Sequence, residues 1–209
     1  MNNMENAKKE RGFTLIELLV VIAILAVLAT AVVLVLNPAE LIKQGRDSTR
    51  ISDLAALNSA IALFVADVRN PTDDGWPGAL NCYPNLTSAT GTPTCSGTME
   101  AGSTSTAVNG GGWIPLNFTA ISSGSPLSKL PIDPIVQSNG SNTACRGTGG
   151  APISCEYIFA ASSTVGVYEI DAAMESVKYS QGGSADVVST DNGSNPNWYE
   201  VGSNLFLLN

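Results

Sequence analysis

The sequence predicts an α+β protein in which a long amino-terminal α-helix packs on a small antiparallel β-sheet. An almost entirely apolar run extends over residues 13–36, and apolar residues then recur at the spacing of one helix face as far as Arg69. After a long polar connection, short β-branched and aromatic runs alternate with turn-forming residues, which is typical of antiparallel strands. With 209 residues, the chain is long enough for one domain and a membrane anchor.

The first predicted element, residues 13–36, is a transmembrane helix. At 1.5 Å per residue it would be about 36 Å long, enough to span the hydrocarbon core of a bilayer. A secretory signal peptide has a shorter apolar segment and is cut after it. The positive-inside rule places residues 1–12 in the cytoplasm and the rest of the chain outside, because three basic residues precede the helix: Lys8, Lys9 and Arg11.

Glu17 places a carboxylate one turn inside this apolar segment. A charge in a membrane-length helix costs roughly 2.5 to 3.5 kcal/mol at the bilayer centre and less near an end, so it usually marks a function. Cleavage after Gly12 would give Phe13 a free amine, largely cationic at neutral pH, that Glu17 could neutralise. The alternative is an uncleaved signal anchor with an incidental glutamate.

The residues around this position resemble the class III signal of type IV pilins and type II secretion pseudopilins. The resemblance rests on Lys8-Lys9-Glu10-Arg11-Gly12, followed by Phe13-Thr14-Leu15-Ile16-Glu17 and a run of apolar residues. It implies that a prepilin peptidase cuts after Gly12 and methylates the new amino-terminal Phe13, while Glu17 guides subunit docking. It also implies two further partners: a pilus or secretion assembly platform, and copies of the same chain in a helical filament.

Residues 37–70 form the second predicted element, an amphipathic helix. Asn37-Pro38-Ala39-Glu40 supplies an N-cap residue, a proline suited to the first helical position and a glutamate at the capping-box place. Either one helix kinks at Pro38, or one helix ends near Leu36 and another begins. Pro38 is a candidate hinge in both cases, and a merely tolerated proline is the alternative.

One face of this second helix is apolar, and its amino-terminal half carries mixed charges. The apolar positions are Ile51, Leu54, Leu57, Ile61, Phe64 or Val65, and Val68. The charged residues are interpreted as a solvated face or as intersubunit ion pairs in a fibre, each of small energy. They are Lys43, Arg46, Asp47, Arg50 and Asp53.

Residues 71–209 are predicted to form an extracytoplasmic globular head. Asn70-Pro71 ends the helix, and the stretch up to Gly112 has the composition of a long connecting loop. Strands are predicted at Trp113–Phe118, Glu156–Ala161, Val165–Asp171 and Trp198–Leu208. The residues expected to face the helix are Tyr157, Phe159, Val165, Val167 and Ile170.

Four cysteines lie in the head, in two local pairs. Oxidation is expected outside the cytoplasmic membrane, and four cysteines allow three connectivities. Sequential pairing, Cys82 with Cys95 and Cys145 with Cys155, closes two short loops and is therefore favoured. A zinc site is the competing interpretation, although neither the spacing nor any histidine supports it.

A looser resemblance to the heads of major pseudopilins comes from Leu130-Pro131-Ile132-Asp133-Pro134 and from Tyr168-Glu169-Ile170-Asp171. Some of these proteins bind calcium near the carboxyl end, so the resemblance implies weak candidate ligands here. They are Asp186, Asp191 and Asn192. The full EF-hand pattern is absent, and solvated loop acids are the alternative. No other cofactor is expected.

The composition argues against an enzyme and against direct nucleic-acid binding. Histidine, the commonest general base, is absent, as are a G-x-S-x-G elbow, a Walker-type loop and C-x-x-C. Net charge is −8, and from Pro71 onward three basic residues stand against eleven acidic ones, so no polybasic face can form. The three are Lys129, Arg146 and Lys178.

These observations favour a pilin-like structural subunit of a type IV pilus. Its helix would wait in the cytoplasmic membrane and then pack with its copies in an extracellular filament. A pseudopilin that assembles into a periplasmic pseudopilus is the first alternative. A membrane-anchored extracytoplasmic enzyme or binding protein is the second, and the sequence offers no catalytic constellation for it.

Overall fold

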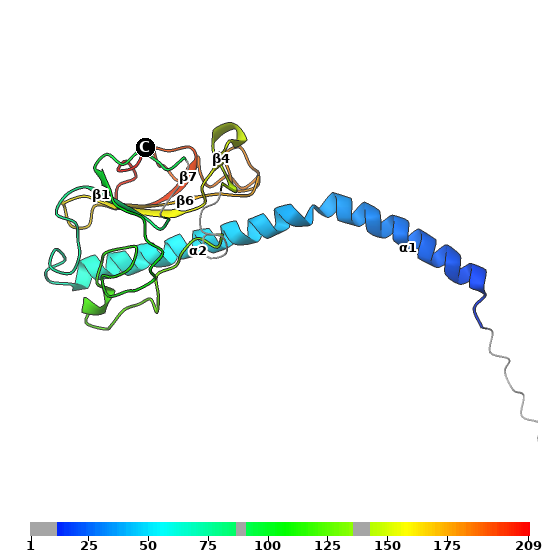
Figure 1. Cartoon of the computed structure of the whole chain (residues 1–209), viewed down its shortest axis with the longest axis horizontal. Coiled ribbons are helices and arrows are strands. Elements are labelled where there is room, and N and C mark those ends of the chain that lie inside the picture. Colours follow the sequence, from blue (N-terminus) through cyan, green and yellow to red (C-terminus); the bar gives the residue numbers. More distant parts are fainter. Residues whose placement is uncertain (1–11, 87–90, 136–142) are drawn as a thin grey trace, which may run out of the picture. The chain divides into compact units, whose positions relative to one another are not determined.

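A computed structural model describes residues 12–86, 91–135 and 143–209 (Figure 1). The predicted leader, apart from Gly12, therefore lies outside the described residues. The chain forms two compact units, Met1–Leu41 and Ile42–Asn209. The first holds the apolar helix and the second holds the head with most of the second helix.

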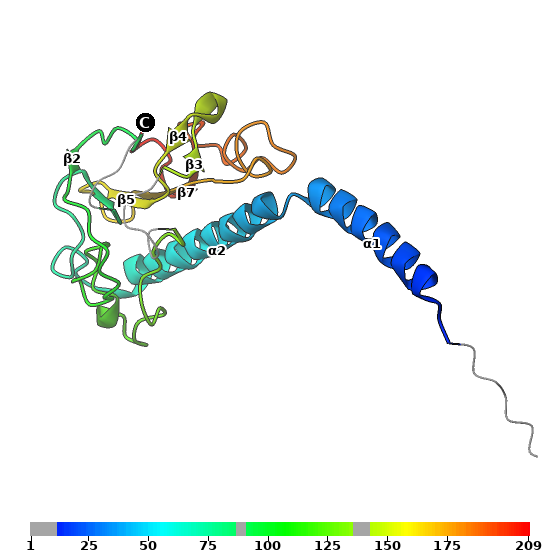
Figure 2. The same ribbon diagram turned by 45° about the vertical axis from the view of Figure 1, so that its right-hand side comes forward.

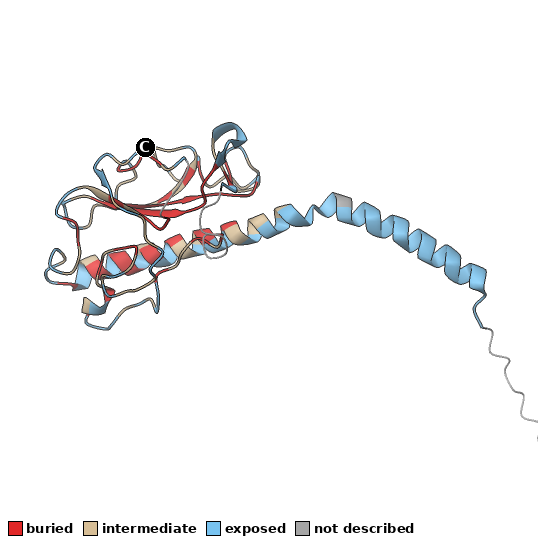
Figure 3. Cartoon of the chain, viewed as in Figure 1, coloured by how far each residue is buried: buried red, intermediate tan, exposed pale blue. Residues whose placement is uncertain are grey.

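Helix α1 (Leu15–Leu36) is apolar on all sides, and every described side chain in it is exposed (Figure 3). Its mean hydropathy is 2.9 over Leu15–Val33, and its length and composition suffice to cross a membrane. The Thr30 hydroxyl donates to the Ala26 carbonyl at 2.9 Å, so it bonds within its own helix. The predicted membrane-length helix is present.

Helix α2 (Pro38–Asp67) is separate from α1. Asn37 between them takes left-handed backbone angles, φ 40° and ψ 73°, which an α-helix does not contain. Its carbonyl accepts from the amides of Glu40 and Leu41 at 3.0 and 3.3 Å and so begins α2. Of the two alternatives at Pro38, the structure has one helix ending at Leu36 and a second one beginning.

A five-stranded sheet lies along α2 in both views (Figures 1 and 2), and the α+β prediction is confirmed. Its spatial order is β2-β1-β5-β6-β7, and all neighbours are antiparallel except β1 and β2. The strands are β1 (Asn81–Pro84), β2 (Thr98–Met99), β5 (Tyr157–Ala161), β6 (Tyr168–Ala173) and β7 (Trp198–Gly202). A separate antiparallel pair joins β3 (Cys145–Arg146) and β4 (Pro152–Ile153), and two short 3₁₀ helices span Phe118–Ala120 and Thr148–Gly150.

One predicted strand and the predicted connecting loop are wrong, because the sequence pattern does not report backbone pairing. The segment Trp113–Phe118 is not a strand, although its residues belong to the core. Trp113 is anchored as a buried side chain whose indole N–H donates to the Pro131 carbonyl at 2.8 Å. Conversely, β1 and β2 form within the stretch predicted to be a loop. The bounds of the other strands also shift, since β5 begins at Tyr157, β6 spans Tyr168–Ala173 and β7 ends at Gly202.

The main core lies between α2 and the facing side of the sheet. The apolar face predicted for the helix is confirmed, with Leu54, Leu57, Ile61 and Phe64 fully buried. Tyr157, Phe159 and Ile170 face this helix as predicted. Val165 and Val167 do not, because Val165 precedes the strand and is 37% exposed, whereas Val167 packs on the opposite face of the sheet.

The opposite face of the sheet has a second, smaller core. Side chains alternate along a strand, so Ile158 and Ala160 of β5 point away from α2. They are covered by both disulfides, by Trp198 and by the last residues of the chain, Leu207 and Leu208. The carboxyl-terminal segment is therefore part of the packed head.

Candidate functional site

The first turn of α1 contains the residues of the predicted processing signal. Phe13 is 92% exposed, and a Cβ added at Gly12 would meet no atom within 4 Å. Thr14 is the N-cap residue of the helix. The Gly12–Phe13 peptide bond is thus free of packing by the described residues and open to a protease.

Glu17 closes a capping box with Thr14. The Glu17 carboxylate oxygen Oε2 accepts from the Thr14 amide at 2.8 Å and from its hydroxyl at 2.7 Å, and the Thr14 hydroxyl accepts from the Glu17 amide at 3.3 Å. This arrangement satisfies helix-terminal donors that lack intrahelical partners. In the uncut chain, the only charged side chain of α1 is therefore bonded locally.

Four of the five charged residues predicted on the first half of α2, namely Arg46, Asp47, Arg50 and Asp53, bond within the head, so their interpretation as a solvated face or as intersubunit partners is wrong. Arg50 is fully buried and donates to Asp47 at 2.7 Å and to both carboxylate oxygens of Asp133 at 2.6 and 3.0 Å. Burial acts to lower the pKa of Arg50, but the Asp133 and Asp47 carboxylates outweigh it and hold that pKa above its usual value. Arg46 binds Glu175 through Nε at 2.7 Å.

Other contacts of this helix face are also intramolecular. The Tyr157 hydroxyl donates to Asp53 at 2.8 Å. Asp47 accepts from the backbone amides of Glu175 and Ser176 at 2.9 and 2.8 Å. These charges hold α2 against the loops of the head, which is a structural role.

Both predicted disulfides are present. Cys82 in β1 binds Cys95, and Cys145 in β3 binds Cys155, with Cα–Cα distances of 6.1 and 5.1 Å. Cys95 also forms a backbone bridge with Leu208, so the first disulfide lies beside the carboxyl-terminal segment. Both bridges fasten segments onto the face of the sheet away from α2.

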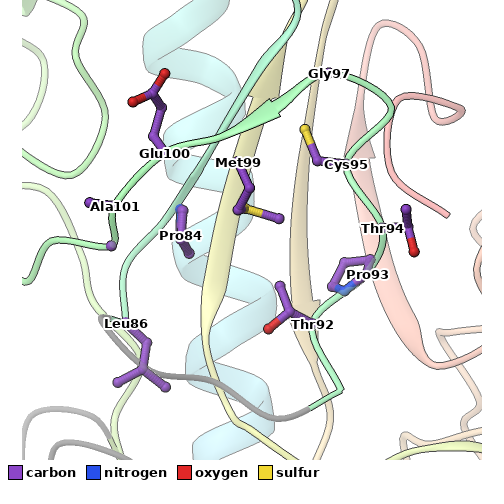
Figure 4. A pocket seen from close by; sticks show the side chains of 11 residues that line it. Pro84, Leu86, Thr92, Pro93, Thr94, Cys95, Gly97, Met99, Glu100 and Ala101 are labelled. Atoms are coloured by element: carbon purple, nitrogen blue, oxygen red, sulfur yellow. The ribbon is translucent and has the colours of Figure 1, made fainter.

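A surface pocket of about 420 Å³ lies next to Cys95 (Figure 4). Pro84, Pro93 and Met99 contribute apolar side chains to it. Among its described lining residues, Glu100 is the one charged side chain, and its carboxylate accepts from the Asn81 side-chain amide at 2.8 Å. Thr92, which also lines the pocket, donates its hydroxyl to the buried Glu156 carboxylate at 2.9 Å.

The candidate calcium ligands of the sequence lie in a loop where their carboxylates bond to backbone. Asp186 accepts from the amides of Gly182, Val188 and Ser189 at 2.7 to 3.0 Å. Asp191 accepts from the amides of Gly193 and Glu200 at 2.9 and 2.8 Å. Asn192 has a left-handed backbone with φ of 69°.

A different set of carboxylates comes together on the outer face of the sheet. Glu169 and Asp171 in β6 and Glu200 in β7 are buried, and one oxygen from each lies within 4.8 Å of the others. Burial raises the pKa of Glu200 to about 8, and burial with the charges of Glu169 and Glu200 raises that of Asp171. We call Glu169, Asp171 and Glu200 the acidic triad.

Sequence analysis missed the acidic triad. The signal was the alternation in Tyr168-Glu169-Ile170-Asp171, which places two acids on the face of β6 opposite Ile170. Charged residues at alternate strand positions usually face solvent, so the pattern predicts exposure. Burial of this face depends on the carboxyl-terminal segment, which the strand pattern does not reveal.

Comparison with known proteins identifies the amino-terminal residues. A family model described as the prokaryotic N-terminal methylation motif matches residues 7–33. No curated protein and no solved structure matches the chain significantly. The matched segment contains Gly12, Phe13 and Glu17 and most of α1. The chain therefore carries the class III signal of prepilin-peptidase substrates, which is typical of type IV pilins and pseudopilins.

Proposed function

We propose that the chain is the structural subunit of a type IV pilus filament. In this proposal prepilin peptidase cuts between Gly12 and Phe13 and methylates the new amine, and α1 then carries assembly. The observation that carries the proposal is the complete exposure of the described α1 side chains, combined with the methylation motif.

An apolar helix of this kind has two stable environments, lipid or a bundle of like helices. In any other environment, the apolar side chains of helix α1 (Leu15–Leu36) would be exposed to water. The free-energy cost of that exposure is about 25 cal/mol for each Å² of apolar surface. The cytoplasmic membrane supplies the first environment before assembly. Copies of the same helix in a filament core supply the second.

Glu17 supplies the register of that bundle. The mature chain would begin with the Phe13 amine, a cation that must lose its water when helices pack. A Glu17 carboxylate of a neighbouring subunit neutralises it, whereas a subunit out of register leaves a buried charge unpaired at a cost of several kcal/mol. In the uncut chain the Thr14 hydroxyl donates to the Glu17 carboxylate. Assembly would therefore replace this local partner of Glu17 with the Phe13 amine of a neighbouring subunit.

The head supports an extracytoplasmic location. Two disulfides suit an oxidising compartment. Its Ser/Thr/Asn-rich loops favour an exposed pilus surface over a short periplasmic pseudopilus. The joint at Asn37-Pro38 would act as a hinge that lets subunits adjust as they pack.

The test uses cells that express the native chain and an antibody against the head. Surface filaments are sheared off, decorated for electron microscopy and analysed by mass spectrometry. The pilus proposal expects labelled filaments whose subunits begin at methylated Phe13. Label confined to the periplasm, with secretion lost on gene deletion, would identify a pseudopilin. An uncut chain that stays in the membrane would identify a signal-anchored protein.

A further inference from the structure

The acidic triad is an unusual feature of the head, because three carboxylates share one buried site. Asp171 pairs directly with Glu200 across β6 and β7, and Glu169 lies two residues from Asp171 on the same face. Like charges directly opposed on a sheet are destabilising. The neighbours across β5 are apolar, since Asp171 pairs with Ile158 and Glu169 with Ala160. We propose that Glu169, Asp171 and Glu200 bind one divalent cation in the head, Ca²⁺ by preference.

Four carboxylate oxygens of the triad have no hydrogen-bond partner. They are Glu169 Oε1, Asp171 Oδ1, Asp171 Oδ2 and Glu200 Oε2, and each is inaccessible to solvent. Asp171 is the strongest case, because its side chain is fully buried and neither oxygen accepts a hydrogen bond. A buried ionised group without partners is too costly to keep unless it is paired or binds a metal.

The other carboxylate oxygen of each glutamate in the triad accepts hydrogen bonds from backbone amides. Glu169 Oε2 accepts from the amides of Leu207 and Leu208 at 2.7 and 3.1 Å. Glu200 Oε1 accepts from the Asn195 amide at 3.0 Å. Backbone donors thus fix one oxygen of each glutamate and leave the other without a hydrogen bond, as in sites where outer contacts position metal ligands.

Gly193 is required for this arrangement. A Cβ at Gly193 would lie 1.1 Å from Glu200 Oε2, so no other residue fits while that oxygen keeps its position. Asp191 holds the same loop by accepting from the Gly193 and Glu200 amides. The Ser194 hydroxyl donates to the Leu208 carbonyl at 2.9 Å and joins this loop to the carboxyl-terminal segment.

No cationic side chain neutralises the triad in the part of the chain that the structure describes. The ion pairs found there belong to Arg46 and Arg50, whose partners are Asp47, Asp133 and Glu175. Burial and the neighbouring carboxylates raise the pKa of Asp171 well above its usual range, as expected for charges that lack a counterion. The missing positive charge is what the proposed cation supplies.

The donor set selects the ion. All free donors are carboxylate oxygens, which suit hard cations and not the softer metals that prefer nitrogen or sulfur. Mg²⁺ keeps several waters in a strict octahedron, whereas Ca²⁺ accepts six to eight oxygens in irregular geometry. A buried site in which Asp171 offers two free oxygens and each glutamate offers one fits Ca²⁺ better. Asp186, Asp191 and Asn192, the earlier candidates, donate none of these oxygens.

Such an ion would join β6 to β7 and to the carboxyl-terminal segment. It would bind β6 and β7 directly and the carboxyl-terminal segment through the Leu207 and Leu208 amides. Because a ligand that binds only the folded state stabilises it, Ca²⁺ should protect the head against unfolding.

The test measures Ca²⁺ binding and thermal unfolding of the full chain in detergent micelles, after treatment with a chelator. The native chain should bind one Ca²⁺ and gain about 5 °C or more in Tm at a hundredfold excess over Kd. Asp171→Asn should weaken Ca²⁺ binding more than tenfold and abolish the gain in Tm. Relief of repulsion should leave this variant at least as stable as the native chain without Ca²⁺.

Asp186→Asn is the matched control, since it removes one carboxylate from the loop and leaves the triad intact. It should bind Ca²⁺ as the native chain does. If Asp171→Asn still bound Ca²⁺ and Asp186→Asn did not, the Ca²⁺ site would lie in the loop of Asp186, and the assignment to the acidic triad would be overturned. A native chain that neither binds Ca²⁺ nor gains stability would also overturn it, and protons shared among the carboxylates would then be the occupants.

Discussion

Arg50 and Asp133, 83 residues apart in the sequence, form a fully buried ion pair through two hydrogen bonds, Nε to Oδ2 at 2.6 Å and Nη2 to Oδ1 at 3.0 Å. The Asp133 carboxylate also accepts from the Ile135 amide at 2.9 Å. The pair fixes the middle of α2 to the segment that follows the core residue Leu130. A charge buried in this way depends on its partner.

Asp133→Ala should therefore destabilise the head strongly. The change leaves Arg50 buried with one carboxylate fewer, which typically costs about 3 to 5 kcal/mol in the free energy of unfolding. Urea unfolding of the full chain in detergent measures it. Asp73→Ala, which removes an exposed carboxylate, should change stability by less than about 0.5 kcal/mol.

The double variant Arg50→Met with Asp133→Leu separates loss of the pair from loss of packing. It removes both charges and keeps much of the volume, so it should recover a large part of the lost stability. If the double variant is as unstable as Asp133→Ala, the cost does not come from an unpaired charge.

Loss of either disulfide should lower the stability of the head and leave membrane insertion unchanged. Each bridge closes a short loop, with sequence separations of 13 and 10, and is worth about 3 kcal/mol on the chain-entropy model. Thermal unfolding of Cys82→Ser/Cys95→Ser and of Cys145→Ser/Cys155→Ser measures this. Each double variant retains the other disulfide, which serves as an internal control. Peptide mapping without reductant should show that this remaining disulfide is intact. Free thiols in the exported native chain would contradict the expectation.

Gly12→Val should block processing. The structure gives a Cβ at Gly12 open space, so an uncut precursor would report a clash in the peptidase and not misfolding of the chain. Gly45→Val is the matched control, because a Cβ there also meets nothing within 4 Å. Mass spectrometry of membranes should find the first variant intact and the second beginning at Phe13. Normal cleavage of Gly12→Val would refute the assigned site.

Glu17→Ala should be inserted, cut and folded, yet assemble poorly. It leaves the Phe13 amine without a partner when helices bundle, whereas a free subunit can keep that amine at the lipid headgroups. Because Glu17 also caps α1 through Thr14, Thr14→Ala is the control. It removes the hydroxyl of the capping box, about 1 kcal/mol, and keeps the carboxylate.

Electron microscopy of sheared surface fractions should show few filaments for Glu17→Ala and near-normal numbers for Thr14→Ala. Equal losses in the two variants would assign Glu17 to capping alone. Normal yield from Glu17→Ala would remove its assembly role altogether.

Glu156 should make the head less stable as pH rises from about 4.5 to about 7. Burial raises its pKa from 4.5 to about 7, although a hydrogen bond from Thr92 at 2.9 Å opposes the shift. The folded state therefore binds the proton more tightly than the unfolded state. This contribution to stability is complete below about pH 4.5 and is lost between there and about pH 7.

Glu156→Gln keeps the shape of a protonated carboxyl and does not titrate. Its stability relative to the native chain should thus increase from pH 5 to pH 8, by a few kcal/mol in total. Urea unfolding at each pH measures the difference, which isolates Glu156 from the other buried acids. A constant difference between Glu156→Gln and the native chain from pH 5 to pH 8 would contradict the assigned pKa.

The sequence by itself determined the features that depend on local pattern. The apolar run gives α1, the methylation motif is a string of adjacent residues, and the period of Leu54, Leu57 and Ile61 gives the buried face of α2. Each disulfide, Cys82–Cys95 and Cys145–Cys155, joins two consecutive cysteines of the sequence. The short loops that these pairs close were enough to favour this connectivity. These features need no knowledge of distant partners.

Only the tertiary structure decided the pairing of β1 and β2, the burial of Arg50 and the acidic triad. Strand pairing in a glycine- and proline-rich stretch depends on an available edge, here β5. Arg50 is buried because Asp133 reaches it from another part of the chain. The triad is enclosed because the carboxyl-terminal residues fold over the outer face of the sheet. Charge at these positions predicts exposure, and only non-local partners make burial possible.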